Sequence, residues 1–492
     1  MQGPGSFSNV PFVIISGPNG YLLVYSPSPG AGFLIASISG TNFSDPYSNA
    51  VMAGITSYAN FSGTWYAQSQ QNGGTVYYTS ASYAGPWTQI GQTDYHTFII
   101  PGTTTPVFNV QGGLETETFL AVISNTAGGG ECWYAPSGDT TGVTDATIIN
   151  TLLTSPYAIN LLPGTYWVNQ PIALPNYAII RGAGRPPLGT TGMTVIKAAG
   201  AANFHSVMCS AGWLGNSGSV ATGVNLSGFK IDANNLVSRC LTLQTYDSTV
   251  EDCSFENSLF QGIVLDGKNE AGTVPMTTSA VNNRFHRCVF NNNGQYNFLT
   301  VNDTTANGVY TDGFLTECDM AGSTIAAISI QFPAGWLVHG NHAYGLDGHG
   351  FQMGKMQNTR ITSNYIEAWG QGGTGGSWYA LDAANTGQTG NGNIVNANIA
   401  WLSAAPGNAG STVDGFAFTC AAASTFRAVV KGNSLYCVPA AGFTAANGIV
   451  YTNAAGTSVT EVISDNEVTG NWTNAQVQVP AGGAMGITQT GV

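Results

Sequence analysis

The stretch VHGNHAYGLDGHGFQMG, residues 338–354, contains the pattern that decides the fold. In its first seven residues, VHGNHAY, the first position is apolar and the fourth is a small polar side chain. This seven-residue pattern recurs along the chain at steps of 23 to 35 residues. The other occurrences are VEDCSFE (250–256), FHRCVFN (285–291), LTECDMA (315–321), ITSNYIE (361–367), VNANIAW (395–401), VKGNSLY (430–436) and ISDNEVT (463–469). The fourth positions form the column Cys253, Cys288, Cys318, Asn341, Asn364, Asn398, Asn433 and Asn466, and the first positions form the apolar column Val250, Phe285, Leu315, Val338, Ile361, Val395, Val430 and Ile463.

A second apolar run lies between successive segments, and Gly, Asn or Asp stands at the corners. Examples of the run are Ile263–Leu265, Ile328–Ile330, Phe351–Met353, Phe416–Phe418 and Ile449–Tyr451. A unit of this length cannot bury its own apolar face, so neighbouring units must stack. The sequence therefore predicts an all-β chain whose main part is a right-handed parallel β-helix, with rungs about 4.8 Å apart. The Cys-to-Asn column becomes an internal structural ladder, in which amides hydrogen-bond one another and thiols act as small hydrophobes.

The segments before the repeat predict small β modules. Short apolar runs at Phe12–Ile15, Tyr21–Tyr25 and Phe33–Ile38, and aromatic alternation at Thr75–Thr79 and Thr97–Ile100, are typical of strands between turns. The best helix candidate is Asp145–Leu153, with Thr144 as its N-cap. We expect an N-terminal leader at 1–60, a small β-rich domain at 61–135, the β-helix at 136–470 and a C-terminal tail at 471–492.

Composition excludes several classes of protein. The chain has 492 residues, 8% of them charged, and a formal net charge of −13, with no Lys or Arg before Arg181 or after Lys431. A nucleic-acid binder needs a basic footprint, which this sequence lacks. Met1–Ser16 has no positive n-region of a signal peptide, and no apolar stretch approaches the roughly 20 residues of a membrane span. The eight cysteines show no metal-ligand spacing, which favours reduced, packed thiols.

Two segments carry a resemblance to known families. Gly138–Gly184, with Thr144-Asp145, Leu162–Tyr166 and Arg181–Gly184, resembles the entry into a pectate-lyase-like β-helix. Gly20–Ile55 resembles a leader found in minor tail proteins of phages that infect actinobacteria. The first resemblance implies the fold. The second implies a virion protein of the phage tail, assembled in the host cytoplasm, whose N-terminal region docks on other tail proteins. Tailspikes of this type are commonly homotrimers that bind, and sometimes cleave, surface glycans.

Candidate catalytic residues gather around the quoted stretch. The alignment places Asp319 and His342 in one column on adjacent coils, as it does Glu251 and His286. Such pairs can serve as general acid and base, or can be ordinary surface ion pairs. The candidates are Asp319, His342, Asp347, His349 and Glu367. Glycoside hydrolysis requires two carboxylates about 5 to 9.5 Å apart. A lyase would use Lys355 or Arg360 with a Ca²⁺ cage, and no dense carboxylate cage is evident. The sequence predicts no metal and no cofactor.

Aromatic residues outside the apolar columns give a second signal. Tyr344, Trp401 and Tyr436 fall at equivalent positions, and Trp369 and Trp378 lie in the intervening loop. Such rings suit the apolar faces of sugars, while polar neighbours hold the hydroxyl groups. Anchoring of loops and contacts within a trimer are alternative roles. We expect a tail adhesin or tailspike-like protein that contacts host envelope polysaccharide. The alternatives are a depolymerase on the same scaffold, a glycoside hydrolase more than a lyase, and a purely structural tail-tip protein.

Overall fold

The computed structural model describes residues 131–490, with gaps, and, before residue 131, only the residues that form strands. The gaps are 155–157, 186–192, 201–203, 303–308, 373–375, 383–388, 403–411, 421–424, 439–443, 454–457 and 479–483. The chain forms two compact units, the first comprising residues 1–167, 179–183 and 192–194, and the second comprising the remainder.

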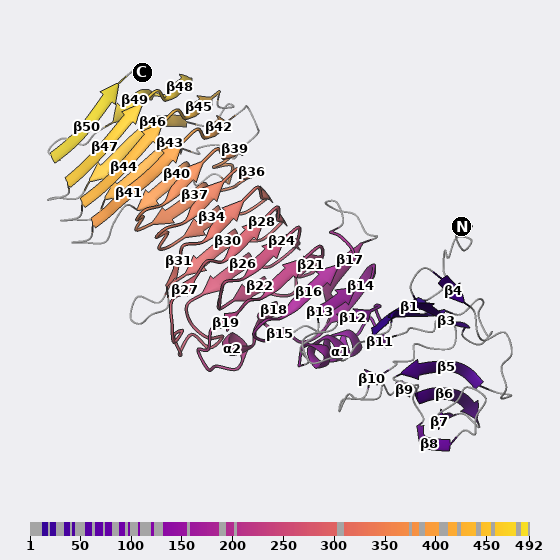
Figure 1. Ribbon diagram of the computed structural model, residues 1–492. Coiled ribbons are helices and arrows are strands. Elements are labelled where there is room, and N and C mark those ends of the chain that lie inside the picture. Colours follow the sequence, from indigo (N-terminus) through magenta and orange to yellow (C-terminus); the bar gives the residue numbers. More distant parts are fainter. Residues whose placement is uncertain are drawn as a thin grey trace. The chain divides into compact units, whose positions relative to one another are not determined.

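The first unit begins with two antiparallel four-stranded sheets (Figure 1). One contains β1 (Phe12–Gly17), β2 (Gly20–Tyr25), β3 (Leu34–Ser39) and β4 (Asn42–Ser44). The other contains β5 (Ile55–Phe61), β6 (Thr64–Gln71), β7 (Gly74–Ser80) and β8 (Thr88–Thr93), and β9 (Thr97–Phe98) pairs with β10 (Val107–Phe108). The predicted strands are present. The β5–β6 hairpin spans residues 60 and 61, where the sequence places a domain boundary.

A mixed sheet and a helix complete the first unit. β11 (Leu120–Val122) runs antiparallel to β12 (Glu131–Tyr134), whereas β13 (Ala158–Leu161) and β16 (Ile179–Gly182) continue it in parallel, and β14 (Gly164–Val168) follows β13 in the chain. Helix α1 (Val143–Leu153) was expected at almost the same place. Its N-cap is Gly142 and not Thr144, because the helix already begins at Val143. The carboxylate of Asp139 accepts the Thr144 N–H at 3.0 Å and so satisfies one donor of the first turn.

Asp145 ties α1 to the neighbouring strands. Its buried carboxylate accepts hydrogen bonds from the Tyr134 hydroxyl, from the Ser137 N–H at 2.9 Å and from the Trp167 N–H at 3.0 Å. Burial raises the pKa of both Asp145 and Tyr134. The aspartate of the Thr144-Asp145 pair therefore has a structural role.

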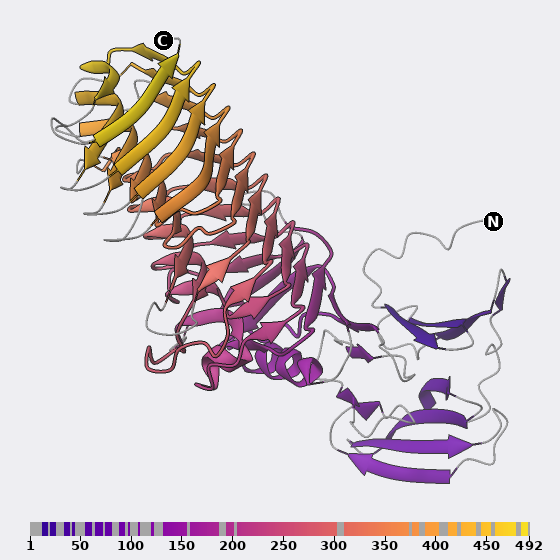
Figure 2. The same cartoon turned by 60° about the vertical axis from the view of Figure 1, so that its left-hand side comes forward.

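The second unit consists mainly of three parallel sheets that the chain visits in turn on each coil (Figure 2). The first sheet contains, in order, β20 (Asn225–Ser227), β24 (Thr249–Glu251), β28 (Arg284–His286), β32 (Phe314–Thr316), β35 (Leu337–His339), β38 (Arg360–Thr362), β41 (Thr389–Asn396), β44 (Thr425–Lys431), β47 (Ser458–Ser464) and β50 (Ala484–Thr490). The second contains β17 (Thr194–Ala198), β21 (Lys230–Asp232), β25 (Ser254–Glu256), β29 (Val289–Asn291), β33 (Asp319–Ala321), β36 (His342–Tyr344), β39 (Tyr365–Glu367), β42 (Ile399–Leu402), β45 (Ser434–Cys437) and β48 (Glu467–Gly470).

The third sheet faces the same interior. It contains β15 (Ile172–Leu174), β18 (Ser206–Ser210), β22 (Arg239–Leu243), β26 (Gln261–Asp266), β30 (Tyr296–Val301), β34 (Ala326–Ile330), β37 (His349–Gly354), β40 (Gly376–Asp382), β43 (Thr412–Cys420), β46 (Thr444–Asn453) and β49 (Asn474–Gln478). Short elements stand between the main strands: α2 (Ala211–Leu214) and the pairs β19 (Ala221–Thr222) with β23 (Thr245–Tyr246) and β27 (Ala280–Val281) with β31 (Tyr310–Thr311). This arrangement is the predicted parallel β-helix.

The strand registers confirm the columns read from the repeat. Val250 pairs with Phe285, Phe285 with Leu315, and so on without a slip to Ile463. In the third sheet the apolar triplets align in the same way, with Ile328 opposite Phe351. Residues in the first column are buried, so they form the apolar interior. The helix continues beyond its predicted end at residue 470, because β49 and β50 pair in parallel with β46 and β47.

The asparagine column forms a hydrogen-bonded ladder at the corner between the first and second sheets. The backbone N–H and the side-chain amide of Asn341 both donate to Oδ1 of Asn364, each at 3.0 Å. Asn364 repeats this toward Asn398, and its Nδ2 also donates to the Val338 carbonyl at 3.1 Å. The pattern continues through Asn433 to Asn466.

Cysteines occupy the same column on the earlier coils. Cys253, Cys288 and Cys318 are buried and free, and their thiols lie near backbone carbonyls, as in the 3.5 Å contact from Cys288 to Val250. Burial raises the pKa of Cys253 and Cys318, which keeps these thiols protonated and unreactive. The backbone N–H of Cys318 donates to Asn341 Oδ1 at 3.0 Å and so joins the two parts of the column.

Candidate functional site

The outer face of the second sheet carries two columns of side chains that point away from the interior. Between them runs a buried column, Met320, Ala343, Ile366, Ala400 and Leu435. The first outer column is Asp319, His342, Tyr365, Ile399 and Ser434, and the second is Ala321, Tyr344, Glu367, Trp401 and Tyr436. We call His342, Tyr344, Tyr365, Glu367, Ile399, Trp401 and Tyr436 the aromatic flank. The predicted alignment of Tyr344 with Trp401 and Tyr436 is confirmed.

His342 lies between two carboxylates. Asp319 Oδ1 is 3.6 Å from Nδ1, and Glu367 Oε1 is 3.5 Å from Nε2. Nε2 makes no hydrogen bond, so its approach to Glu367 is an electrostatic contact. The imidazole ring stacks on Tyr365 at a centroid distance of 4.9 Å and an interplanar angle of 13°, and it lies 5.0 Å from the ring of Tyr344. The three predicted catalytic candidates Asp319, His342 and Glu367 therefore share one cluster.

Both tyrosines in this cluster stay protonated over a wide range of pH. The Tyr365 hydroxyl donates to Glu367 Oε2 at 2.7 Å. Burial, and next the bond to Glu367, raise the pKa of Tyr365 to about 12. Burial also raises the pKa of Tyr344, with a smaller contribution from the charges of Asp319 and Glu367. The cluster thus offers two neutral phenols and two carboxylates.

Farther along the flank, large apolar side chains are open to solvent. Trp401 is 47% exposed, Tyr436 is 39% exposed and Ile399 is 50% exposed. The rings of Trp401 and Tyr436 are 6.1 Å apart and nearly perpendicular, at 81°. Exposure of large apolar side chains costs free energy unless a ligand or partner covers them, so this group indicates an interaction surface.

The structure corrects one predicted contact residue and adds two. Trp369 is fully buried, and its indole N–H donates to the Asp414 carbonyl at 3.1 Å, so its ring cannot face a ligand. Trp378 lies in β40, where its side chain falls outside the described residues. Tyr365 and Ile399 belong to the flank and were not predicted, although they directly follow the ladder residues Asn364 and Asn398 and so occupy the column of His342.

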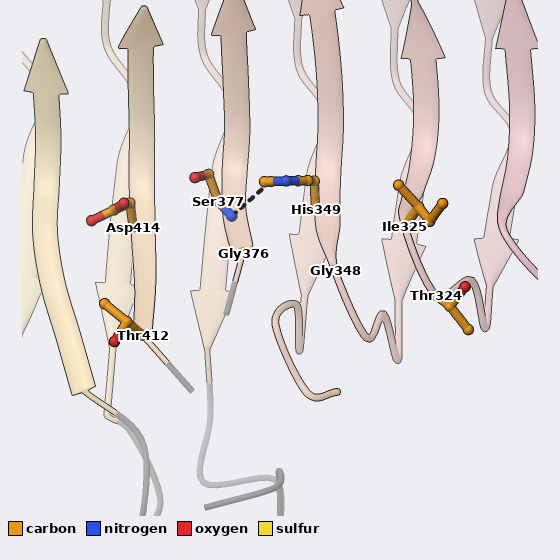
Figure 3. Close-up of a pocket in the computed structure, with 8 residues that line it drawn as sticks. All are labelled: Thr324, Ile325, Gly348, His349, Gly376, Ser377, Thr412 and Asp414. Atoms are coloured by element: carbon orange, nitrogen blue, oxygen red, sulfur yellow. Dashed lines mark hydrogen bonds between the residues drawn. The ribbon is translucent and has the colours of Figure 1, made fainter. Parts of the chain in front are cut away.

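The remaining catalytic candidates lie elsewhere. Asp347 is exposed in the corner after β36, and His349 begins β37 in the third sheet. His349 lines a hollow of about 410 Å³ with Thr324, Ile325, Gly348, Gly376, Ser377, Thr412 and Asp414 (Figure 3). Its Nδ1 accepts the Ser377 N–H at 3.0 Å, and burial lowers its pKa. Asp347 is not among the residues that line this hollow, so the DGHG tetrapeptide does not act as one unit.

Other predicted pairs make structural contacts. Glu251 and His286 are neighbours in register, but His286 contacts the Thr316 hydroxyl at 2.9 Å and Arg287 at 2.7 Å. The amine of Lys355 lies 3.8 Å from the ring centroid of Phe332. Within the described ranges, no three His, Cys, Asp or Glu side chains gather as a metal ion would require. In the same part of the chain, no helix is long and apolar enough to cross a bilayer.

Comparison with known proteins identifies no family for this chain. No family model matches the sequence, and no curated protein matches it significantly. Similar solved structures include PfbA, a surface adhesin of Streptococcus pneumoniae (11% identity, 70% of this chain and 87% of that chain, TM-score 0.40). Another is the Dettilon tailspike protein (10% identity, 72% of this chain and 66% of that chain, TM-score 0.44). A third is a GH87 α-1,3-glucanase from Streptomyces thermodiastaticus (15% identity, 77% of this chain and 70% of that chain, TM-score 0.39). At these identities and scores the similarities do not identify a function.

Proposed function

We propose that this chain is a phage tail adhesin whose aromatic flank binds the polysaccharide of a host cell envelope. The observation that carries the proposal is the alignment of Tyr344, Trp401 and Tyr436 on one outward-facing column, next to the carboxylates of Asp319 and Glu367. Aromatic rings cover the apolar faces of sugar rings, and carboxylates and phenols hold their hydroxyl groups. The rungs repeat along the solenoid, so successive sugars of an extended chain can meet successive coils.

The geometry of the His342 cluster favours binding over hydrolysis. A glycosidase needs its two carboxylates on opposite sides of the scissile bond, with the space between them open to the sugar. Asp319 and Glu367 instead approach opposite nitrogens of one imidazole ring, at 3.6 and 3.5 Å. Because the ring fills the gap between them, no glycosidic oxygen can enter it. Release of reducing ends from the glycan would contradict this proposal and support the depolymerase alternative.

The test is retention of the purified chain on cell-wall glycan isolated from an actinobacterial host. The double variant Trp401→Ala with Tyr436→Ala should bind roughly tenfold more weakly or worse, because central aromatic contacts carry most of the energy of an interface. Phe260→Ala is the matched control, since Phe260 is also exposed, at 42%, but precedes β26 in the third sheet. Normal binding by the double variant would reject the flank. Absence of glycan binding by the unmodified chain would favour a purely structural role.

The assembly that we propose is a homotrimer whose N-terminal region attaches to other tail proteins. Parallel copies raise the effective concentration of weak glycan sites, and avidity can exceed the single-site affinity by roughly a hundredfold. The low charge of the chain, −13 over 492 residues, limits repulsion between flanks that pack side by side. Sedimentation at micromolar concentration should give the trimer mass, and a monomer there would reject the assembly.

A further inference from the structure

The hollow around His349 has chemistry different from that of the aromatic flank. It crosses the first residues of β37, β40 and β43 in the third sheet, and its side-chain lining is mostly polar (Figure 3). Its volume of about 410 Å³ lies within the usual range for a small-molecule site. No Phe, Tyr or Trp side chain belongs to its described lining, so any ligand must be held chiefly by hydrogen bonds.

Two glycines keep part of this surface at the level of the backbone. A Cβ at position 348 would lie 2.3 Å from the Ile325 carbonyl oxygen, and one at position 376 would lie 2.5 Å from the Gly348 carbonyl oxygen. Neither contact is sterically possible, so only glycine fits at either position without a backbone shift. Because the two glycines stand on adjacent coils, no side chain fills this part of the sheet.

The side chains of the hollow resemble a hydrolytic triad in composition but not in order. A triad needs histidine between serine and aspartate. Here Ser377 lies between the other two: Asp414 is its register partner on β43, and its backbone N–H donates to His349 on β37. Figure 3 shows the His349 imidazole reaching toward Ser377 and the Asp414 carboxylate on the far side of it. His349 therefore cannot relay a proton from Ser377 to Asp414, and the arrangement is suited to binding.

The hydrogen bonds already present define what each group offers to a ligand. The Nδ1 atom of His349 accepts the Ser377 N–H, so the neutral imidazole carries its proton on Nε2 and acts as a donor. The Asp414 Oδ1 atom accepts from the Asn447 amide at 2.8 Å, which fixes the carboxylate and leaves Oδ2 as an acceptor. The hydroxyl groups of Ser377 and Thr412 can donate or accept.

We propose that this hollow is a separate binding site for one neutral sugar residue, held through its hydroxyl groups. Different hydroxyl groups of one sugar ring can donate to Asp414 and accept from His349. The carboxylate disfavours phosphate, sulfate and uronate groups through like-charge repulsion, and the polar lining disfavours apolar ligands. The site stands on its own residues and does not depend on the aromatic flank.

Two conservative variants test the site. His349→Asn places an amide oxygen where Nδ1 accepts the Ser377 N–H but removes the Nε2–H donor. Asp414→Asn keeps an acceptor for Asn447 but removes the charge. Saturation-transfer NMR of the full chain with the methyl glycosides of glucose, galactose, mannose and rhamnose provides the measurement, because it detects weak binding. We expect at least one glycoside to bind. Asp414→Asn should weaken it roughly tenfold or more and His349→Asn roughly threefold or more, since bonds to charged acceptors are the stronger ones.

The matched control is Phe260→Ala, an exposed ring outside both sites, which should leave this signal unchanged. The flank variant, Trp401→Ala with Tyr436→Ala, removes sugar bound at the flank, so the saturation transfer that remains reports the hollow. Circular dichroism melts establish that each variant is folded, and Thr412→Val, at an exposed position of the same hollow, gives a further folded variant that should weaken binding. Saturation transfer that disappears with the flank variant and persists in Asp414→Asn would overturn the proposal without affecting the flank. Binding of glucosamine with no binding of any neutral glycoside would also overturn it, because an ammonium group would then be the ligand of Asp414.

Discussion

Adjacent residues of each repeated segment perform opposite tasks. In ITSNYIE the fourth residue, Asn364, is buried in the ladder, whereas the fifth and seventh, Tyr365 and Glu367, face outward on the flank. The ladder position is Asn on every coil from residue 341 to residue 466. The outward positions change from coil to coil, from Asp to His, Tyr, Ile and Ser in one column. Uniform columns therefore build the solenoid, and varied columns give a particular coil its surface chemistry.

The largest stability effect should follow a change in the ladder. Asn364→Leu removes the acceptor of both the backbone and the side-chain N–H of Asn341, and it removes the donor to the Val338 carbonyl. Each buried polar group left without a partner costs about 1–3 kcal/mol, so the variant should lose roughly 3 kcal/mol or more in free energy of unfolding. Thermal melting followed by circular dichroism checks this. A variant that melts no lower than the unmodified chain would show that the ladder does not stabilise the coil.

A smaller loss is expected where cysteine replaces asparagine in the column. Cys288→Ala removes one buried sulfur whose contacts to carbonyls are long, 3.5 Å to Val250. The cost should be about 1 kcal/mol, similar to removing one buried methyl group. The same melting experiment compares the two variants directly. If Cys288→Ala were as damaging as Asn364→Leu, the thiols would be hydrogen-bonding partners of the same weight as the amides.

A third prediction concerns the pKa of Tyr365. The substitution that tests it should change the free energy of unfolding little at neutral pH. The pKa of Tyr365 in the folded chain, about 12, lies above its usual value of 10.0. The protonated phenol therefore contributes its full share to the free energy of unfolding below pH 10, and this stabilisation is lost as the pH rises through 12. Glu367→Gln should lower the pKa of Tyr365 toward 10, because the charged acceptor is gone. NMR titration of ring-labelled tyrosine measures it, with Tyr365→Phe assigning the resonance. An unchanged pKa in Glu367→Gln would mean that burial alone raises it.

The smallest stability effect belongs to the outer positions. Trp401→Ala with Tyr436→Ala removes exposed side chains, so the free energy of unfolding should change by no more than about 0.5 kcal/mol at each site. Denaturant unfolding of the double variant gives the value. A loss as large as that of Asn364→Leu would show that these rings support the fold, and the contrast between ladder and flank would fail.

The sequence predicted the features that depend on strand register, and it missed those that depend on the backbone conformation of the corners between strands. Alternation along a strand fixes which residues face outward, so the columns of Asp319 with His342 and of Tyr344 with Trp401 were correct. Trp369 lies in a corner, where no period fixes the direction of a side chain, and it is buried. The hollow was not predicted, because it depends on the absence of side chains at Gly348 and Gly376, and no residue pattern in the sequence marks that absence.

The most direct test of the glycan-binding claim is a structure of the chain with an oligosaccharide released from the host envelope. We expect sugar rings against Trp401 and Tyr436, with hydroxyl groups near Glu367. Ordered sugar on the outer face of the first sheet, with the flank left bare, would contradict it.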